Sequence, residues 1–327
     1  MCKKNVLYSI QSLIDEPETG KDLINNSFDG LCDFKEKKLF TVNTKDELIQ
    51  TFKEIQKNID PNSNDMIFLS LDMHGSDKGL QLTDSNNKRT DVCWEEIIED
   101  LVSINKFSHM HLILMMSSCC GGKFIEYSGV YKKGAPYYFL FGPKAKTTGS
   151  HIFNANIAII KELFEGDDIA MDEIISNFND DYKKDHRDLP EYIFSNAYDL
   201  FIHIFTIEMN NIISPLGIAQ KVKEKVKDLL QNEEKFEDVK DNLFDNLKDN
   251  FNNYFSKQVV KDIFTKWWEE YMFGRDKFLN DTPLVVFNRL WEENNAIQNI
   301  KRMRMDEKFF QLAIKAYAEE FPNFAID

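Results

Sequence analysis

The sequence predicts an α/β fold, a doubly wound and mostly parallel sheet flanked by helices, followed by an all-helical C-terminal region. Three observations predict it. Short apolar runs alternate with amphipathic helical patterns through residues 1–182, as in chains whose helices cross over between parallel strands. Two of the runs are apolar almost throughout, which is typical of parallel strands buried on both faces. The pattern then becomes helical in residues 183–327, so we expect two domains.

Each element of the first domain follows from its own pattern. Thr44 and Glu47 form a capping box at the start of a helix over residues 44–59, whose apolar residues fall on one face. The polar residues between the first two strands, which include Gly20 and Gly30, are expected to form a loop. Strands are predicted at residues 5–13, 38–42, 66–73, 111–118 and 137–141, and further helices at residues 94–104 and 150–164.

The second domain consists of helical segments separated by proline and glycine. Helices are predicted at residues 189–213, 217–232, 236–273, 283–305 and 306–321. We expect this helical domain to regulate the first one, or to bind a substrate or a partner protein.

Composition and charge exclude several classes of protein. The 327 residues are 43% hydrophobic, enough for a large core, and carry a net charge of -15 from 40 basic and 55 acidic residues. Such a surface repels phosphate backbones and anionic lipids, so direct binding to nucleic acid or to a membrane is not expected. No apolar run reaches the roughly 18 residues that a membrane-spanning helix needs.

The number and spacing of the cysteines bear on disulfide formation, metal binding and the cellular compartment. The five cysteines are odd in number and irregularly spaced, which argues against a disulfide framework and favours a reducing cytoplasm. No cysteine or histidine spacing is typical of a zinc site, and no glycine-rich phosphate-binding motif follows a predicted strand. We therefore expect neither a metal nor a cofactor.

Two central strands end in reactive side chains. His74 and Gly75 follow the run that begins at residue 66, and Ser-Cys-Cys-Gly-Gly at residues 118–122 follows the run that begins at residue 111. Functional residues of parallel sheets lie beyond the carboxyl ends of the strands. If these strands are neighbours, a strand-hairpin-helix connection across the 45 residues from His74 to Cys119 (119 − 74 = 45) brings both groups to one edge. The polar stretch TDSNNKRTD at residues 83–91 is expected to form an exposed loop.

A histidine beside a cysteine suits thiol chemistry. An imidazole can take the proton of a thiol and so produce the nucleophilic thiolate. Glycine after each group lets the backbone approach a substrate, and the backbone N–H groups of Gly75, Cys120 and Gly121 are candidates for binding an oxyanion. We expect hydrolysis of an acyl bond through an acyl-thioester.

A strand ending in His-Gly, followed 45 residues later by a strand ending in Ser-Cys-x-x-Gly, resembles the caspase-like cysteine peptidases of clan CD. The pattern is closest to that of the CHAT-domain proteases, and the segments at residues 74–84 and 137–166 are similar to theirs. The resemblance covers about residues 66–180. It implies a thiol protease that cuts a protein substrate with a Cys-His dyad, in a regulated signalling or bacterial defence pathway.

The resemblance assigns the role of nucleophile to Cys119 and that of acid and base to His74, because Gly122 then aligns with the glycine of the family. A metacaspase-like alignment of the Cys-Cys pair instead makes Cys120 the nucleophile. That alignment puts Lys123 where the family has glycine. Cys119 is therefore preferred, and Cys120 stays open as the alternative.

The resemblance also points to the pocket for the residue before the cut. Ser117 matches the family's pocket position, two residues before the nucleophile. Strand alternation puts Asp72 on the same face as His74, where it would favour Arg or Lys in the substrate if its side chain faces the cleft. The alternative is that Asp72 caps or bridges groups within the fold.

Two other functions remain open from the sequence. The chain would be a catalytically idle caspase-like adaptor if Cys120 disturbs the dyad, binding a partner protein through the helical region. It would be a plain α/β binding domain if the His-Gly and Cys-Cys motifs are coincidental. The peptidase is expected to have a protein substrate and an activating or regulatory protein partner.

Overall fold

The computed structural model describes residues 5–12, 18–30, 34–60, 62–63, 65–165, 179–180, 191–213, 256–273 and 283–293. The chain divides into two compact units. The first comprises Met1–Phe201 and Tyr271–Arg275, and the second comprises Ile202–Glu270 and Asp276–Asp327.

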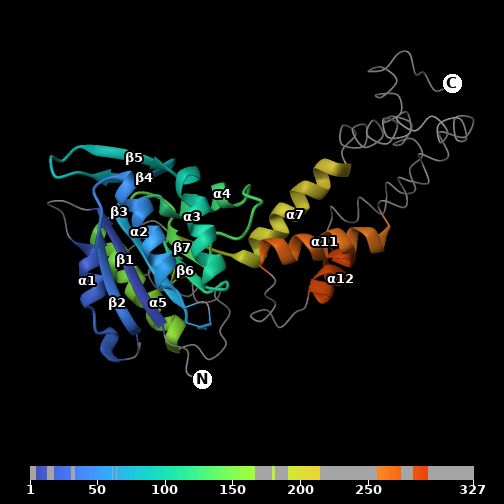
Figure 1. The fold of residues 1–327 in the computed structure, drawn as a ribbon, viewed down its shortest axis with the longest axis horizontal. Helices are drawn as coiled ribbons and strands as arrows, with labels where there is room; N and C mark the ends of the chain where they lie inside the picture. The colour runs from blue at the N-terminus through green and yellow to red at the C-terminus, as the bar shows by residue number, and fades with distance from the viewer. Residues whose placement is uncertain are drawn as a thin grey trace, which may run out of the picture. The chain divides into compact units, whose positions relative to one another are not determined.

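A mostly parallel sheet forms the centre of the first unit (Figure 1). Its strands are β1 (Asn5–Ser12), β2 (Phe34–Thr41), β3 (Ile67–Ser76), β4 (Gly79–Thr83), β5 (Arg89–Cys93), β6 (Leu112–Met115), β7 (Phe139–Pro143) and β8 (Tyr192–Asn196). The order is β2-β1-β3-β6-β7-β8, and neighbours in it are parallel except for β7 and β8. The hairpin of β4 and β5 is joined to the carboxyl end of β3 by three residue pairs.

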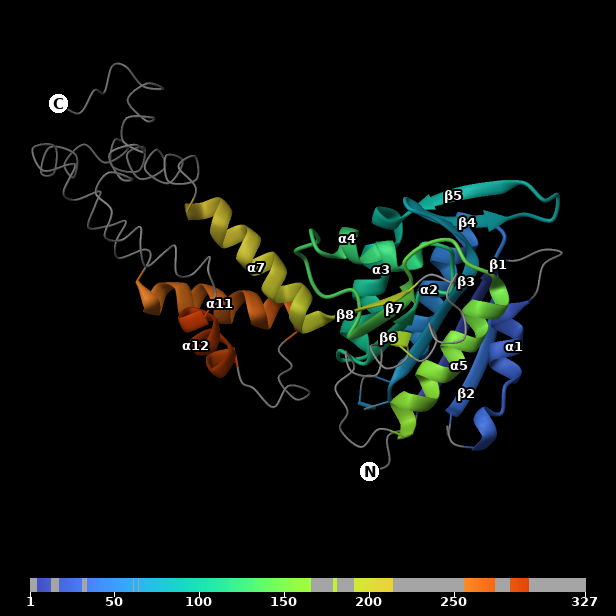
Figure 2. The ribbon, with the colours of Figure 1, turned by 180° about the vertical axis from the view of Figure 1, so that it is seen from behind.

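Helices cover both faces of this sheet. They are α1 (Thr19–Asn25), α2 (Lys45–Asn58), α3 (Trp94–Phe107), α4 (Phe124–Ser128) and α5 (Gly149–Glu165), with short 3-10 turns at Phe28–Gly30 and Gly121–Lys123. Helices α2 and α3 lie on the face seen in Figure 1, and α1 and α5 lie on the face seen in Figure 2. The predicted α/β class, with a mostly parallel sheet flanked by helices, is confirmed. The predicted capping box of α2 is also present, since the Thr44 hydroxyl accepts the N–H of Glu47 at 3.2 Å.

An apolar core fills the space between the sheet and the α1–α5 layer. Phe68, Ile113 and Phe141 point into it from β3, β6 and β7, and Leu23 and Ile159 complete it from the helices, each at most 2% exposed. Burying a side chain of this size stabilises the fold by about 1.5–3 kcal/mol relative to leaving it in water. The core therefore holds β3 and β6, whose ends carry the predicted site, in one continuous sheet.

Several segments differ from their predictions, and one of them is residues 83–91, whose ends belong to β4 and β5 where an exposed loop is predicted. Thr19–Asn25 forms helix α1 where the sequence predicts a polar loop, because Leu23, its one buried apolar side chain, anchors a helix too short to show a clear period. Tyr192–Asn196 forms β8 within residues 189–213, which the sequence predicts to be wholly helical. A five-residue segment that begins with Tyr-Ile-Phe fits either element, and only its antiparallel pairing with β7 decides for the strand.

The first unit consequently extends past the boundary predicted at residue 182. It includes β8 and continues to Phe201. Tyr271 also belongs to it, and its carbonyl oxygen accepts the N–H of Ala135 at 3.0 Å.

Aromatic side chains hold together the described helices of the second unit. These helices are α7 (Ala197–Ile213), whose first turn belongs to the first unit, α11 (Lys257–Tyr271) and α12 (Pro283–Glu293). The ring of Phe264 on α11 lies 4.9 Å from that of Phe205 on α7 and 5.5 Å from that of Phe287 on α12, between centroids. Residues 217–232, 236–255 and 294–321, where helices are predicted, lie outside the described residues.

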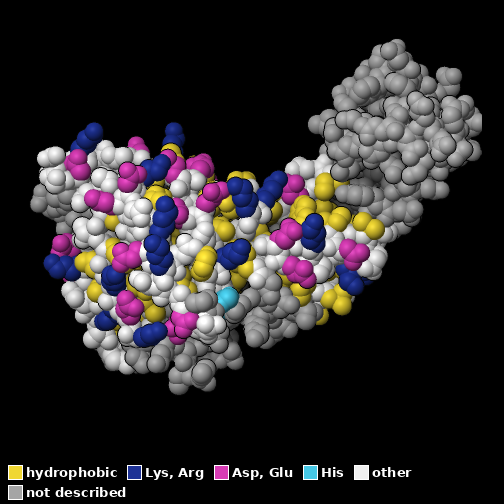
Figure 3. Space-filling model, in the orientation of Figure 1, with side chains coloured by type: hydrophobic (Ala, Val, Ile, Leu, Met, Phe, Trp, Pro, Cys, Tyr) yellow, Lys and Arg dark blue, Asp and Glu magenta, His cyan; other side chains and the backbone are white. Residues whose placement is uncertain are grey.

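The surface of the first unit mixes charges of both signs. On the face shown in Figure 3, acidic and basic side chains are interspersed. Charged side chains of the first unit also form ion pairs, including Lys38 with Glu54 at 2.6 Å and Lys45 with Glu96. None of the described helices is long and apolar enough to cross a membrane.

Candidate active site

The ends of β3 and β6 meet at the carboxyl edge of the sheet. The two strands pair in parallel up to Ser70 and Met115, and beyond that point His74 lies near the end of β3 while Cys119 follows β6. Gly75 packs directly against the cysteine turn. A Cβ built on Gly75 would lie 2.4 Å from the carbonyl oxygen of Cys119. The structure thus brings together the two strand ends that the sequence singles out.

Gly75→Ala is expected to push these strand ends apart. Real Cβ atoms do not approach a backbone oxygen to 2.4 Å, so either β3 or the cysteine turn must shift. A displacement of about 1 Å can slow a positioned reaction about a hundredfold. The rate at which a peptidyl electrophile modifies Cys119 should fall by about that factor, while far-UV circular dichroism stays unchanged. A Gly75→Ala variant that reacts at the wild-type rate would show that this contact does not set the geometry.

The two adjacent cysteines lie in different environments. Cys119 is partly exposed, and its Sγ donates a hydrogen bond to the Thr147 carbonyl at 3.3 Å and accepts one from the Thr147 N–H at 3.5 Å. Cys120 is 6% exposed, and burial, followed by the nearby Asp77 carboxylate, raises the pKa of its thiol to about 11. Cys120 therefore stays protonated at neutral pH. The sequence leaves the choice between the two open, and these surroundings favour Cys119 as the reactive sulfur.

The glycines of the turn are required by packing inside the protein. A Cβ on Gly121 would lie 2.5 Å from the Met116 carbonyl oxygen, and a Cβ on Gly122 would lie 2.3 Å from a side-chain carbon of Ile193. Cys120 itself adopts a left-handed conformation with φ of 59°, which is uncommon for a residue with a side chain. The sequence interprets these glycines as giving a substrate access to the backbone, whereas here they make room for β6 and β8.

Two of the three predicted oxyanion donors are already engaged. The N–H of Cys120 donates to the Ala145 carbonyl at 3.1 Å, and the N–H of Gly121 donates to the Ser118 carbonyl at 2.9 Å. The prediction that the N–H groups of Cys120 and Gly121 are available to an oxyanion is therefore wrong in this structure, while the N–H of Gly75 stays a predicted donor. The N–H of Cys119 has no hydrogen-bond partner within the described parts of the chain. Sequence reasoning missed this donor, because only the turn geometry shows which N–H groups remain available.

His74 contacts a residue that the sequence does not single out. Its Nε2 lies 3.2 Å from Nη2 of Arg89, at the start of β5. A guanidinium group has donors and no acceptor, so Nε2 is the acceptor and the imidazole is neutral. Arg89 lies in the stretch expected to form an exposed loop. The pairing of β4 with β5 brings Arg89 to the histidine, and the register of this pairing cannot be predicted from composition.

The two predicted pocket residues are buried in one polar network. Asp72 is 1% exposed and accepts hydrogen bonds from Ser70 at 2.5 Å, Ser9 at 2.8 Å and Thr19 at 3.2 Å. Burial raises the pKa of Asp72 to about 6, against the opposing effect of these hydroxyls. Of the two alternatives for Asp72, the structure therefore shows the one in which it bridges groups within the fold.

Ser117 joins the same network from the segment that follows β6. Asn156 on α5 donates to the Ser117 hydroxyl at 2.7 Å, and the hydroxyls of Ser117 and Ser70 lie 2.6 Å apart. Because Ser70 gives its proton to Asp72, Ser117 is the donor to Ser70. Ser117 is 3% exposed, so neither it nor Asp72 lines an open cleft in this structure.

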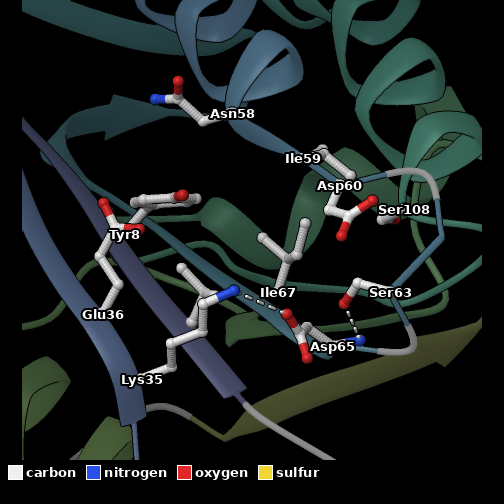
Figure 4. A pocket seen from close by; sticks show the side chains of 11 residues that line it. Tyr8, Lys35, Glu36, Asn58, Ile59, Asp60, Ser63, Asp65, Ile67 and Ser108 are labelled. Atoms are coloured by element: carbon white, nitrogen blue, oxygen red, sulfur yellow. Dashed lines mark hydrogen bonds and ion pairs between the residues drawn. The ribbon is translucent and has the colours of Figure 1, made fainter.

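A polar pocket lies at the opposite edge of the sheet (Figure 4). It is lined by Tyr8, Lys35, Asp65 and other residues near the amino ends of β1, β2 and β3. Ile67, which also lines it, is seven residues before His74, or about 23 Å along the strand. The pocket is therefore separate from the ends of β3 and β6.

No family model matches the chain, and no curated protein is significantly similar to it in sequence.

Proposed function

We propose that the chain is a caspase-like cysteine endopeptidase, most similar to the CHAT-domain proteases, that hydrolyses peptide bonds of a protein substrate. One observation carries the proposal. Gly75, which follows His74, packs against the backbone of Cys119, so the imidazole and the thiol extend from two strand ends in contact. Covalent catalysis by a thiol requires a base within reach of the nucleophile, and this packing places the strand ends that carry the two groups side by side. The motif His-Gly, then Ser-Cys-x-x-Gly, gives independent support.

Each residue has a defined role in the proposed reaction. His74 takes the thiol proton, and the Cys119 sulfur then attacks the carbonyl carbon of the scissile peptide bond. The N–H of Cys119, with that of Gly75 as a second predicted donor, stabilises the oxyanion. His74 returns the proton to the leaving amine, and water hydrolyses the thioester to free the sulfur. Asp72 and Ser117 would contribute to a substrate pocket only after the buried network opens.

Covalent labelling tests the proposal. A peptidyl electrophile is expected to modify Cys119, and His74→Ala should slow this reaction about a hundredfold or more because the general base is lost. Cys93, an exposed thiol at the end of β5, is the internal control, and its labelling should be the same in both proteins. Equal rates at Cys119 with and without His74 would contradict the dyad.

The adaptor alternative has one observation in its favour. In this structure His74 bonds to Arg89 and Cys119 bonds to Thr147, so each member of the dyad has another partner. An idle adaptor would leave Cys119 unlabelled, and a partner protein would co-purify through the helical region.

A further inference from the structure

The hydrogen bond from Arg89 determines what His74 can do. Since Nε2 accepts an N–H of the guanidinium group, a neutral imidazole carries its own proton on Nδ1. Neither ring nitrogen can then accept a proton from a thiol. A doubly protonated imidazolium is also excluded while this bond lasts, because both of its nitrogens are donors. His74 cannot act as a base until Arg89 leaves Nε2.

The cysteine is held in a matching resting state. The thiol of Cys119 donates its proton to the carbonyl oxygen of Thr147, which a thiolate cannot do. Thr147 lies in the loop between β7 and α5. Both members of the proposed dyad are therefore neutral, and each is bonded to a residue outside the dyad.

The side chain of Arg89 can leave His74 without any movement of the core. Arg89 is exposed at the first position of β5, whereas the hairpin itself is anchored by the buried side chains of Leu80, Leu82 and Val92. Gln81, which pairs with His74, donates to Asp91 at 2.7 Å on the same face of this hairpin. Displacing Arg89 therefore leaves the apolar core of the first unit intact.

We propose that Arg89 is a latch that keeps most molecules inactive by occupying Nε2 of His74, so that the wild type reacts through the fraction of molecules in which Arg89 has left. This inference rests on the proposed peptidase function, and it makes Arg89 a positioning residue that acts through His74. When the guanidinium group leaves, the imidazole gains a free lone pair. It then takes the Cys119 proton, so that a thiolate and an imidazolium form together.

Alkylation by iodoacetamide measures this step without requiring a peptide substrate. Arg89→Met keeps the aliphatic stem of the side chain and removes every N–H donor. Pairing with an imidazolium increases the fraction of Cys119 present as thiolate and lowers the nucleophilicity of each thiolate, so we expect Cys119 to react roughly threefold to tenfold faster at pH 7. Peptide mass spectrometry assigns each alkylated cysteine, and Cys120 should stay at its wild-type rate. Lys88→Ala, which removes a neighbouring hairpin cation, is the matched control and should change nothing.

The outcomes separate the latch from the peptidase activity. Alkylation of Cys119 in Arg89→Met at the wild-type rate or more slowly would overturn the latch, as would a gain that persists when His74→Ala is added. Faster alkylation of Cys120 as well would indicate loosened packing and would also overturn it. A His74-dependent gain without proteolysis would support the latch and contradict the peptidase. Proteolysis by the wild type, together with an unchanged alkylation rate of Cys119 in Arg89→Met, would support the peptidase and contradict the latch.

Discussion

Cys119→Ala is expected to abolish cleavage of protein substrates, because the attacking sulfur is lost. Loss of a catalytic nucleophile lowers turnover by at least about a thousandfold. The measurement is incubation with a proteome followed by N-terminal sequencing of new fragments. The wild type is compared with Cys119→Ala. Arg89→Met is compared with the double variant that carries both Arg89→Met and Cys119→Ala. Fragments that appear equally with and without the Cys119 sulfur would contradict the proposed nucleophile.

Cys120→Ala is the matched control for this experiment. The Cys120 thiol is buried, its pKa is raised to about 11, and its N–H bond to Ala145 is kept by alanine. We expect cleavage within about threefold of the wild-type rate, since small changes away from the reacting atoms have modest effects. Loss of activity in Cys120→Ala with retention in Cys119→Ala would reverse the assignment in favour of Cys120.

Asp72→Asn is expected to change how stability depends on pH. The folded pKa of Asp72 is about 6, above its ordinary value of 3.8, so the folded state binds this proton more tightly than the unfolded state. The resulting stabilisation is fully present below the unfolded pKa and is lost as the pH rises through about 6. Linkage over this interval predicts that the wild type loses about 2 kcal/mol relative to Asp72→Asn between pH 4.5 and pH 7.5.

Denaturant unfolding of both proteins at the two pH values measures this difference. Asparagine can keep the network, because Ser9, Ser70 and Thr19 can each rotate to accept from or donate to its amide. Asp46→Asn, which removes an exposed carboxylate on α2, controls for the loss of one negative charge. A difference between wild type and Asp72→Asn that is the same at both pH values would show that Asp72 does not titrate as described.

The central strands were predictable because their signal is local. A strand buried on both faces must be apolar at nearly every position, so β3 and β6 stand out in the sequence, as do the reactive residues after them. The start of α2 is equally local, since the capping box joins residues three apart. By contrast, β8 is a strand only because β7 is beside it, and Tyr192–Asn196 contains no signal that excludes a helix.

In the candidate site, too, some features follow from local sequence and others depend on contacts between distant parts of the chain. The motif names His74 and Cys119, but which residues engage them depends on pairs that are distant in the chain. Arg89 reaches His74 through the register of a hairpin, and Ser9 reaches Asp72 from a position 63 residues earlier. Accessibility of the two sulfurs likewise depends on how the turn packs against β6 and β8.

The sequence by itself determined the α/β class, the two central strands and the reactive residues at their ends, because burial and backbone preference act over a few neighbouring residues. Only the tertiary structure decided that Cys120 is buried, that Asp72 is satisfied within the fold and that Arg89 bonds to His74. These outcomes depend on hydrogen bonds and packing between strands that are separate in the chain, and no local pattern encodes them.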